Sequence, residues 1–94
     1  MERVINGLRY DTEKAKVAAT NRYWDGHNWD RHGRTRSLMK TPKGNFFVFN
    51  ETRWQGEIDT ITPVDIEQAK ALYEELPVQE MDYQEAFGVE AEEA

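Results

Sequence analysis

The run Phe46-Phe47-Val48-Phe49 constrains the fold of this chain more than any other feature. Successive side chains of a β-strand point to opposite faces, so this run places apolar groups on both faces. Such a strand needs cover on both sides, which favours a central position in a sheet. Because the preceding Thr41-Pro42-Lys43-Gly44 suits a tight turn, we expect a β-hairpin formed by residues 35–40 and 45–50.

A second hairpin is expected at the N-terminus. Asn6-Gly7 lies between two short β-prone runs, and both residues tolerate the positive φ angles of a type I′ turn. Asp11 or Thr12 can then cap a helix, with Glu13 in its first turn. We therefore expect a short helix over residues 12–20.

The C-terminal half predicts one short strand followed by helices. Ile58 to Ile61 reads as the strand, and Thr62-Pro63 resembles an N-cap followed by proline at the first helical position. A helix over residues 63–75 follows. Pro77 ends it and starts a second short helix, for which Gly88 is the expected C-cap.

These elements predict an α+β fold. It consists of an N-terminal β-hairpin, a short helix, a three-stranded antiparallel meander and two C-terminal helices packed on the sheet. The length of 94 residues predicts a single domain over 1–88, followed by a flexible acidic tail over 89–94. The expected core is Ile5, Leu8, Ala15, Ala18, Leu38, Phe46, Val48, Ile61, Ile66, Ala69, Leu72, Leu76 and Phe87.

Composition excludes several kinds of chemistry. The chain has no cysteine, which removes disulfides, thiol catalysis and cysteine-bound metals. His27 and His32 lie five residues apart, a spacing that fits neither a helical nor a finger-type metal site. No nucleophile elbow or phosphate-binding glycine pattern is present. We therefore expect no enzyme activity, no cofactor and no metal. Without an apolar run of roughly 18–20 residues or a signal peptide, a cytoplasmic protein is expected.

Charge is divided unevenly along the chain. Residues 1–53 hold 11 basic and 6 acidic side chains, whereas residues 54–94 hold 1 basic and 12 acidic ones. The net charge is −6. Such polarity bears on partners and on association rates. It predicts an acidic face on the two C-terminal helices that binds a basic protein surface: Glu67, Glu74, Glu75, Glu80, Asp82 and Glu85. The alternative is that these carboxylates only keep the protein soluble.

A basic and aromatic segment supports a different interpretation. Residues 21–33 are expected to form a long loop, and residues 22–43 hold six cations with three aromatic rings among them. This combination is typical of proteins that hold single-stranded nucleic acid. The candidate residues are Trp24, Trp29, Arg31, Arg34 and Arg36. The net negative charge opposes phosphate, so direct nucleic-acid binding is the less favoured reading.

The sequence resembles a group of small proteins encoded by bacteria, phages and other mobile elements. The resemblance rests on Ile5-Asn6-Gly7-Leu8-Arg9-Tyr10-Asp11-Thr12-Glu13, on Leu38-Met39-Lys40-Thr41-Pro42-Lys43-Gly44-Asn45-Phe46-Phe47, on Ile61-Thr62-Pro63 and on Ala86-Phe87-Gly88. The group shares "ING-x-RYDT" and "LY-[RK]-T-x-x-G-x-[FW]-F" segments. Met39 stands where an aromatic residue is usual. The resemblance implies one α+β domain and assigns no activity.

Two functional hypotheses follow. The first is a non-catalytic protein–protein interaction module. By analogy with other small acidic proteins of mobile elements, it would inhibit a nucleic-acid-handling host defence complex, of the anti-CRISPR or anti-restriction type. The second is a single-stranded nucleic-acid-binding protein that uses residues 22–43.

Overall fold

The computed structural model describes residues 1–21, 34–52, 56, 58–89 and 93, without the side chain of Arg34. Their elements follow in chain order: β1 (Glu2–Ile5), β2 (Leu8–Asp11), β3 (Lys16–Thr20), β4 (Arg34–Lys40), β5 (Phe46–Thr52), β6 (Thr60–Val64), α1 (Ile66–Glu75), β7 (Val78–Gln79) and α2 (Tyr83–Phe87). The α+β class is confirmed at this level, with more strand than helix.

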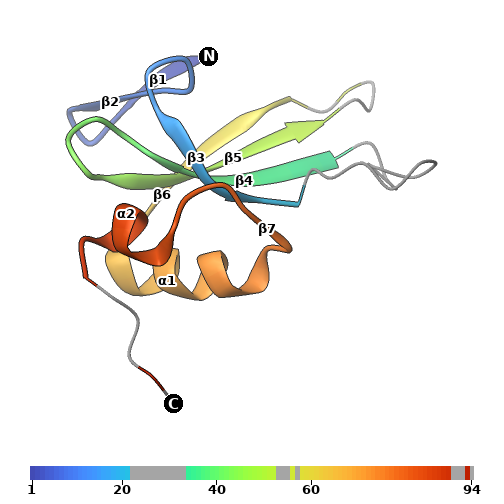
Figure 1. The fold of residues 1–94 in the computed structure, drawn as a ribbon. Helices are drawn as coiled ribbons and strands as arrows, with labels where there is room; N and C mark the ends of the chain where they lie inside the picture. The colour runs from blue at the N-terminus through green and yellow to red at the C-terminus, as the bar shows by residue number, and fades with distance from the viewer. Residues whose placement is uncertain (22–33, 53–55, 57, 90–92, 94) are drawn as a thin grey trace.

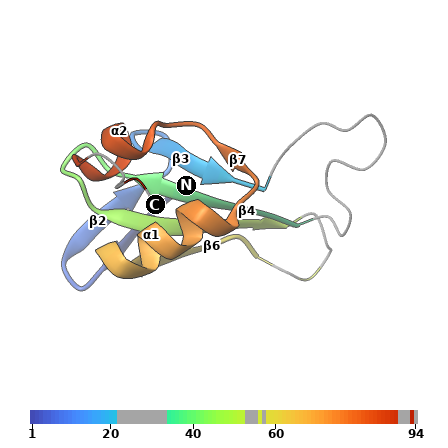
Figure 2. The same ribbon diagram turned by 60° about the horizontal axis from the view of Figure 1, so that its bottom comes forward.

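The elements form three layers around a central antiparallel sheet. Its five strands lie in the order β6-β5-β4-β3-β7, and β1 and β2 form a separate two-stranded hairpin. Figures 1 and 2 show the hairpin on one side of the sheet and both helices on the other. The predicted three-stranded meander is therefore too short. Strands β3 to β6 form a meander of four, and β7 pairs with the outer edge of β3.

The N-terminal hairpin is confirmed. Asn6 and Gly7 have φ angles of 53° and 79°, as a type I′ turn requires. The register pairs Val4 with Arg9 and Ile5 with Leu8. Tyr10 anchors the hairpin to the sheet because its ring meets the Phe47 ring edge-on, at 5.5 Å between centroids.

The predicted helix over residues 12–20 is wrong, because residues 16–20 form β3. A single turn precedes the strand, in which the Asp11 carboxylate accepts the Glu13 N–H at 2.9 Å. A bulge between Val17 and Ala19 then lets both Ala18 and Ala19 pack fully buried in the core beneath the helices. Pairing with β4 outweighs the local helix propensity of the alanines.

The central position of β5 is confirmed. It lies between β4 and β6, and Phe46, Phe47 and Val48 are all buried. Phe46 belongs to the core on the helical side, and Phe47 belongs to a second core beneath the N-terminal hairpin. The β4–β5 turn is also confirmed, with a φ angle of 91° at Gly44.

The start of the long helix differs from the prediction. Strand β6 runs through Pro63, which pairs with Phe47, and α1 begins only at Ile66. Proline is tolerated in β6 because this is an edge strand. The N-cap is Asp65, which accepts the Gln68 N–H at 2.8 Å while the Gln68 side chain accepts the Asp65 N–H at 3.1 Å.

Three further predictions need correction. Ile58 precedes β6 and is 74% exposed, so it does not belong to the strand. Leu8 and Ile66 were expected in the core but are 49% and 45% exposed. After Pro77 the chain first forms β7, so the second helix begins only at Tyr83. Gly88 does cap it, with a φ angle of 77°.

Candidate functional site

The two helices present carboxylates on the outer side of the molecule. Helix α1 turns Ala69, Leu72 and Leu76 toward the sheet. Glu67 and Glu74 are exposed on its other side, and Asp82 is exposed at the N-cap position of α2. Within the described part of the chain, none of these three carboxylates forms an ion pair. They define what we call the acidic helical surface.

Aromatic contacts fix α2 beside α1. The Tyr73 hydroxyl donates to the Met81 carbonyl at 2.7 Å. Its ring packs edge-on against the rings of Tyr83 and Phe87, at 5.7 and 5.5 Å between centroids. Burial, and secondarily the negative charge of Asp82, raise the pKa of the Tyr73 hydroxyl. Asp82, at the start of α2, therefore lies close to Tyr73 of α1.

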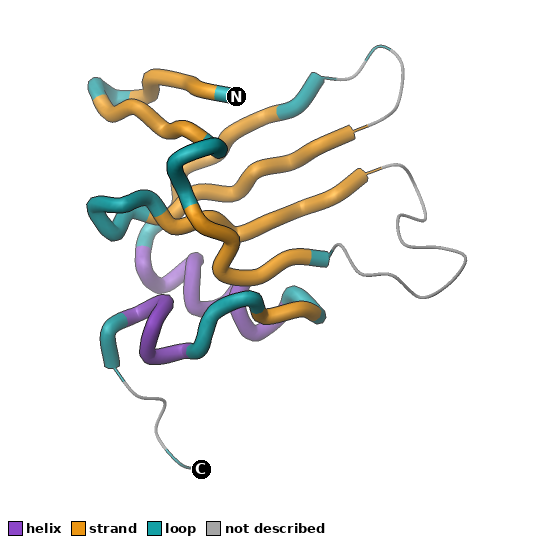
Figure 3. Tube along the Cα trace, turned by 45° about the horizontal axis from the view of Figure 1, so that its top comes forward, coloured by secondary structure: helices purple, strands orange, loops and turns teal. Residues whose placement is uncertain are grey.

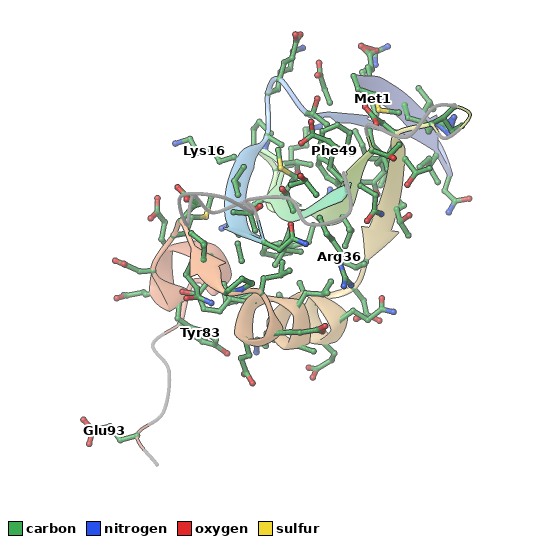
Figure 4. The ribbon with its side chains drawn as sticks, turned by 90° about the vertical axis from the view of Figure 1, so that its right-hand side faces the viewer. Met1, Lys16, Arg36, Phe49, Tyr83 and Glu93 are labelled. Atoms are coloured by element: carbon green, nitrogen blue, oxygen red, sulfur yellow. The ribbon has the colours of Figure 1, made fainter. Side chains whose placement is uncertain are left out.

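Glu75 is not part of the acidic helical surface, because it forms an ion pair with a residue of the sheet. Its Oε1 lies 3.9 Å from Nη2 of Arg36, a residue of β4. Figure 4 shows Arg36 between the sheet and the helices. The pair joins one residue of the predicted acidic face to one residue of the predicted nucleic-acid site.

Glu80 and Glu85 also lie apart from the acidic helical surface. The Glu80 N–H donates to the Ala18 carbonyl, and Glu80 lines a cavity of about 350 Å³ on the hairpin side of the sheet, with Thr20, Ser37 and Glu51. Glu85 lines a cavity of about 320 Å³ together with three lysines. Of the six predicted acidic residues, Glu75, Glu80 and Glu85 therefore have contacts away from the outer side of the helices.

The remaining residues of the predicted nucleic-acid site cannot be placed together. Trp24, Trp29 and Arg31 lie outside the described residues, as do His27 and His32. Arg34 begins β4, and only its backbone is described. Of the predicted tail, only Val89 and Glu93 are described.

The structure brings together a group of cations at one end of the sheet that the sequence does not predict. Lys16 on β3 stands directly opposite Lys40 on β4, and Lys43 follows in the β4–β5 turn. Lys14 lines two cavities beside this turn. Figure 3 shows the β1–β2 turn and the β4–β5 turn at this same end. The register of β3 against β4 brings Lys16 beside Lys40. A helix over residues 12–20 does not predict this pairing.

Further observations concern metal sites, membrane-spanning helices and similarity to known proteins. Among the described residues, no group of three or more histidine, aspartate or glutamate side chains could hold a metal ion. Neither described helix is long and apolar enough to cross a membrane. Comparison of the chain with protein-family models, with curated proteins and with solved structures finds no match.

Proposed function

We propose that this chain is a non-catalytic interaction module that binds a basic protein through the acidic helical surface. The observation that carries the proposal is that Glu67 and Glu74 on α1 and Asp82 at the N-cap of α2 are exposed and without an ion pair in the described part of the chain. The two helices are joined by the rings of Tyr73, Tyr83 and Phe87. Lys70 is the only basic residue of these helices, and its Nζ lies 6.0 Å from the centre of the Phe87 ring. Lys70 stands one turn from both Glu67 and Glu74 and offsets part of their charge, but within the described part of the chain it forms an ion pair with neither.

Carboxylates that lie close together repel one another and so destabilise the folded protein. A partner with the opposite charge relieves this repulsion when it binds. Complementary potentials accelerate association and select the partner, more than they increase affinity. The partner class that fits is a protein with a basic channel for nucleic-acid phosphates. The resemblance to mobile-element proteins points to a host defence complex of the CRISPR or restriction type.

Charge reversal provides the test. We expect the protein to inhibit DNA cleavage by a susceptible effector within a panel of purified CRISPR and restriction complexes. The triple variant Glu67→Lys, Glu74→Lys, Asp82→Lys should abolish inhibition and keep its circular dichroism spectrum. Glu80→Lys is the matched control, because it reverses an exposed carboxylate on the other side of the sheet.

Salt gives a second readout. Because the attraction is screened, moderate salt should slow association much more than it accelerates dissociation. Inhibition that survives the triple reversal would contradict the proposal. A panel in which no complex is inhibited would also contradict the assignment to defence complexes.

Single-stranded nucleic-acid binding remains the second candidate. Arg36 supports it less than the sequence implied, because its guanidinium is paired with Glu75. We expect weak binding to single-stranded DNA or RNA at physiological salt. Micromolar affinity that is lost on Trp29→Ala would favour this candidate instead.

A further inference from the structure

A cavity of about 350 Å³ lies between the N-terminal hairpin and the β4–β5 turn. Its volume falls within the range of small-molecule sites. The lining comes from two segments that are far apart in the sequence, within residues 7–14 and within residues 41–45. Figure 3 shows these segments close together at one end of the molecule.

Leu8 gives this cavity an apolar wall that is about half exposed. The hairpin register places Leu8 on the same side as Tyr10, which faces the sheet. Tyr10 is 6% exposed against Phe47, whereas Leu8 is 49% exposed. A large aliphatic side chain on the inner side of a hairpin is normally covered. Leu8 has Ile5 directly opposite it in the hairpin, yet it stays half exposed because the space between it and the β4–β5 turn is open.

Two ammonium groups give the cavity a positive charge. Within the described part of the chain, neither Lys14 nor Lys43 forms an ion pair. Arg9 also lines the cavity, with its Nε 3.2 Å from a Glu2 carboxylate oxygen. The carboxylate among the lining residues is Asp11, whose Oδ1 already accepts the Glu13 N–H. The lining residues thus carry three cations, Arg9, Lys14 and Lys43, against the one carboxylate of Asp11, so the cavity has a net positive charge.

From this combination we infer that the cavity binds a nucleoside phosphate. The ammonium groups of Lys14 and Lys43 would hold the phosphate, since lysine binds phosphate as a compact point charge. Leu8 and Pro42 would contact the flat base. A free nucleotide fits better than a nucleic-acid strand, because a net charge of −6 repels a polyanion more strongly than a small anion. This inference is independent of the acidic helical surface.

The test uses adenosine 5′-monophosphate as the probe, with binding followed by calorimetry and by NMR chemical shifts of the full chain. We expect saturable binding that shifts the amide signals of Leu8, Lys14 and residues 41–45. The variant Lys14→Ala, Lys43→Ala should weaken binding by about tenfold or more, through loss of charge-assisted contacts. Lys16→Ala is the matched control, because Lys16 lines the neighbouring cavity and not this one.

Three further ligands separate the contributions and the source of the phosphate. Adenosine and inorganic phosphate should each bind more weakly than the nucleotide, and a single-stranded oligonucleotide should bind no more tightly. Equal binding of adenosine would overturn the role of the lysines. An oligonucleotide that binds more tightly than the nucleotide would overturn the assignment to a free nucleotide. Absence of binding, or shifts confined to other residues, would overturn the site itself.

Discussion

Arg36 on β4 and Glu75 at the end of α1 form an ion pair, with 3.9 Å between Nη2 and Oε1. Glu75 lies in the last turn of a helix that has no basic residue there, where a negative charge opposes the helix dipole. The guanidinium of Arg36 offsets this unfavourable position. The pair also joins the sheet to the helical layer near the N-terminal end of β4. An external ligand that binds either residue would have to compete with this pair.

This pair should contribute little to stability, because its side chains are 44% and 63% exposed. A double-mutant cycle of Arg36→Ala and Glu75→Ala in urea denaturation should give a coupling free energy of about 0.2–1 kcal/mol. High salt should reduce it. The cycle of Arg36→Ala with Glu74→Ala is the control and should show no coupling. A coupling that high salt leaves unchanged would argue against an exposed pair.

The corrected start of α1 gives a second prediction. Asp65→Ala removes the side chain that accepts the Gln68 N–H, so it should lower the free energy of unfolding by about 1 kcal/mol. Thr62→Ala changes the residue that the sequence favoured as the cap, yet Thr62 is an exposed residue of β6. It should therefore destabilise the protein less. Thermal or urea unfolding compares the two variants. A larger loss of unfolding free energy for Thr62→Ala than for Asp65→Ala would indicate that the helix begins after Thr62.

The elements that the sequence predicted correctly are those with strong local signals. Asn6-Gly7 requires positive φ angles, and Phe46 to Phe49 require cover on both faces, so their local chemistry admits few alternatives. Residues 12–20 were misassigned because their alanines suit a helix locally. Their strand form depends on a partner, β4, that follows more than a dozen residues later. Strand β7 was missed for the same reason, since its two residues gain their partner only from β3.

The candidate sites follow the same rule. Helical spacing correctly placed Glu67 and Glu74 away from the core, because both lie within one regular element. It failed for Glu80, since this residue follows a strand and lines a cavity on the hairpin side. The cavity between Leu8 and Lys43 could not be predicted at all. It exists only because two turns from separate hairpins end side by side.

A third prediction concerns the N-terminal turn. Gly7 has a φ angle of 79°, which a β-branched side chain adopts only with strain, although a Cβ atom there would meet no neighbouring atom. Gly7→Val should therefore destabilise the protein by about 1–2 kcal/mol through backbone strain alone. Gly7→Asn is the control and should cost much less, because asparagine tolerates this region. An unchanged melting temperature for Gly7→Val would contradict the turn.

The final prediction uses the partly buried hydroxyl of Tyr73. Its pKa is raised above the usual value of 10.0 by burial and by the charge of Asp82. The folded state therefore favours the neutral hydroxyl, which donates to the Met81 carbonyl. The stabilisation is fully present below the unfolded-state pKa of about 10, and it is lost as the pH rises through the higher folded-state pKa. We expect the unfolding free energy to fall in this alkaline range.

Tyr73→Phe should remove part of that alkaline dependence, because phenylalanine has no proton to lose. At neutral pH it should cost about 0.5–1.5 kcal/mol, the contribution of one hydrogen bond. Tyr83→Phe is the matched control, since it removes a hydroxyl from the same aromatic group and leaves the bond from Tyr73 to Met81 in place. Urea denaturation of the three proteins across neutral and alkaline pH measures both effects. If Tyr73→Phe kept the full alkaline loss of the wild type, the titration of Tyr73 would not be its cause. The contact between Tyr73 and Met81 would then have to persist after the Tyr73 hydroxyl has lost its proton.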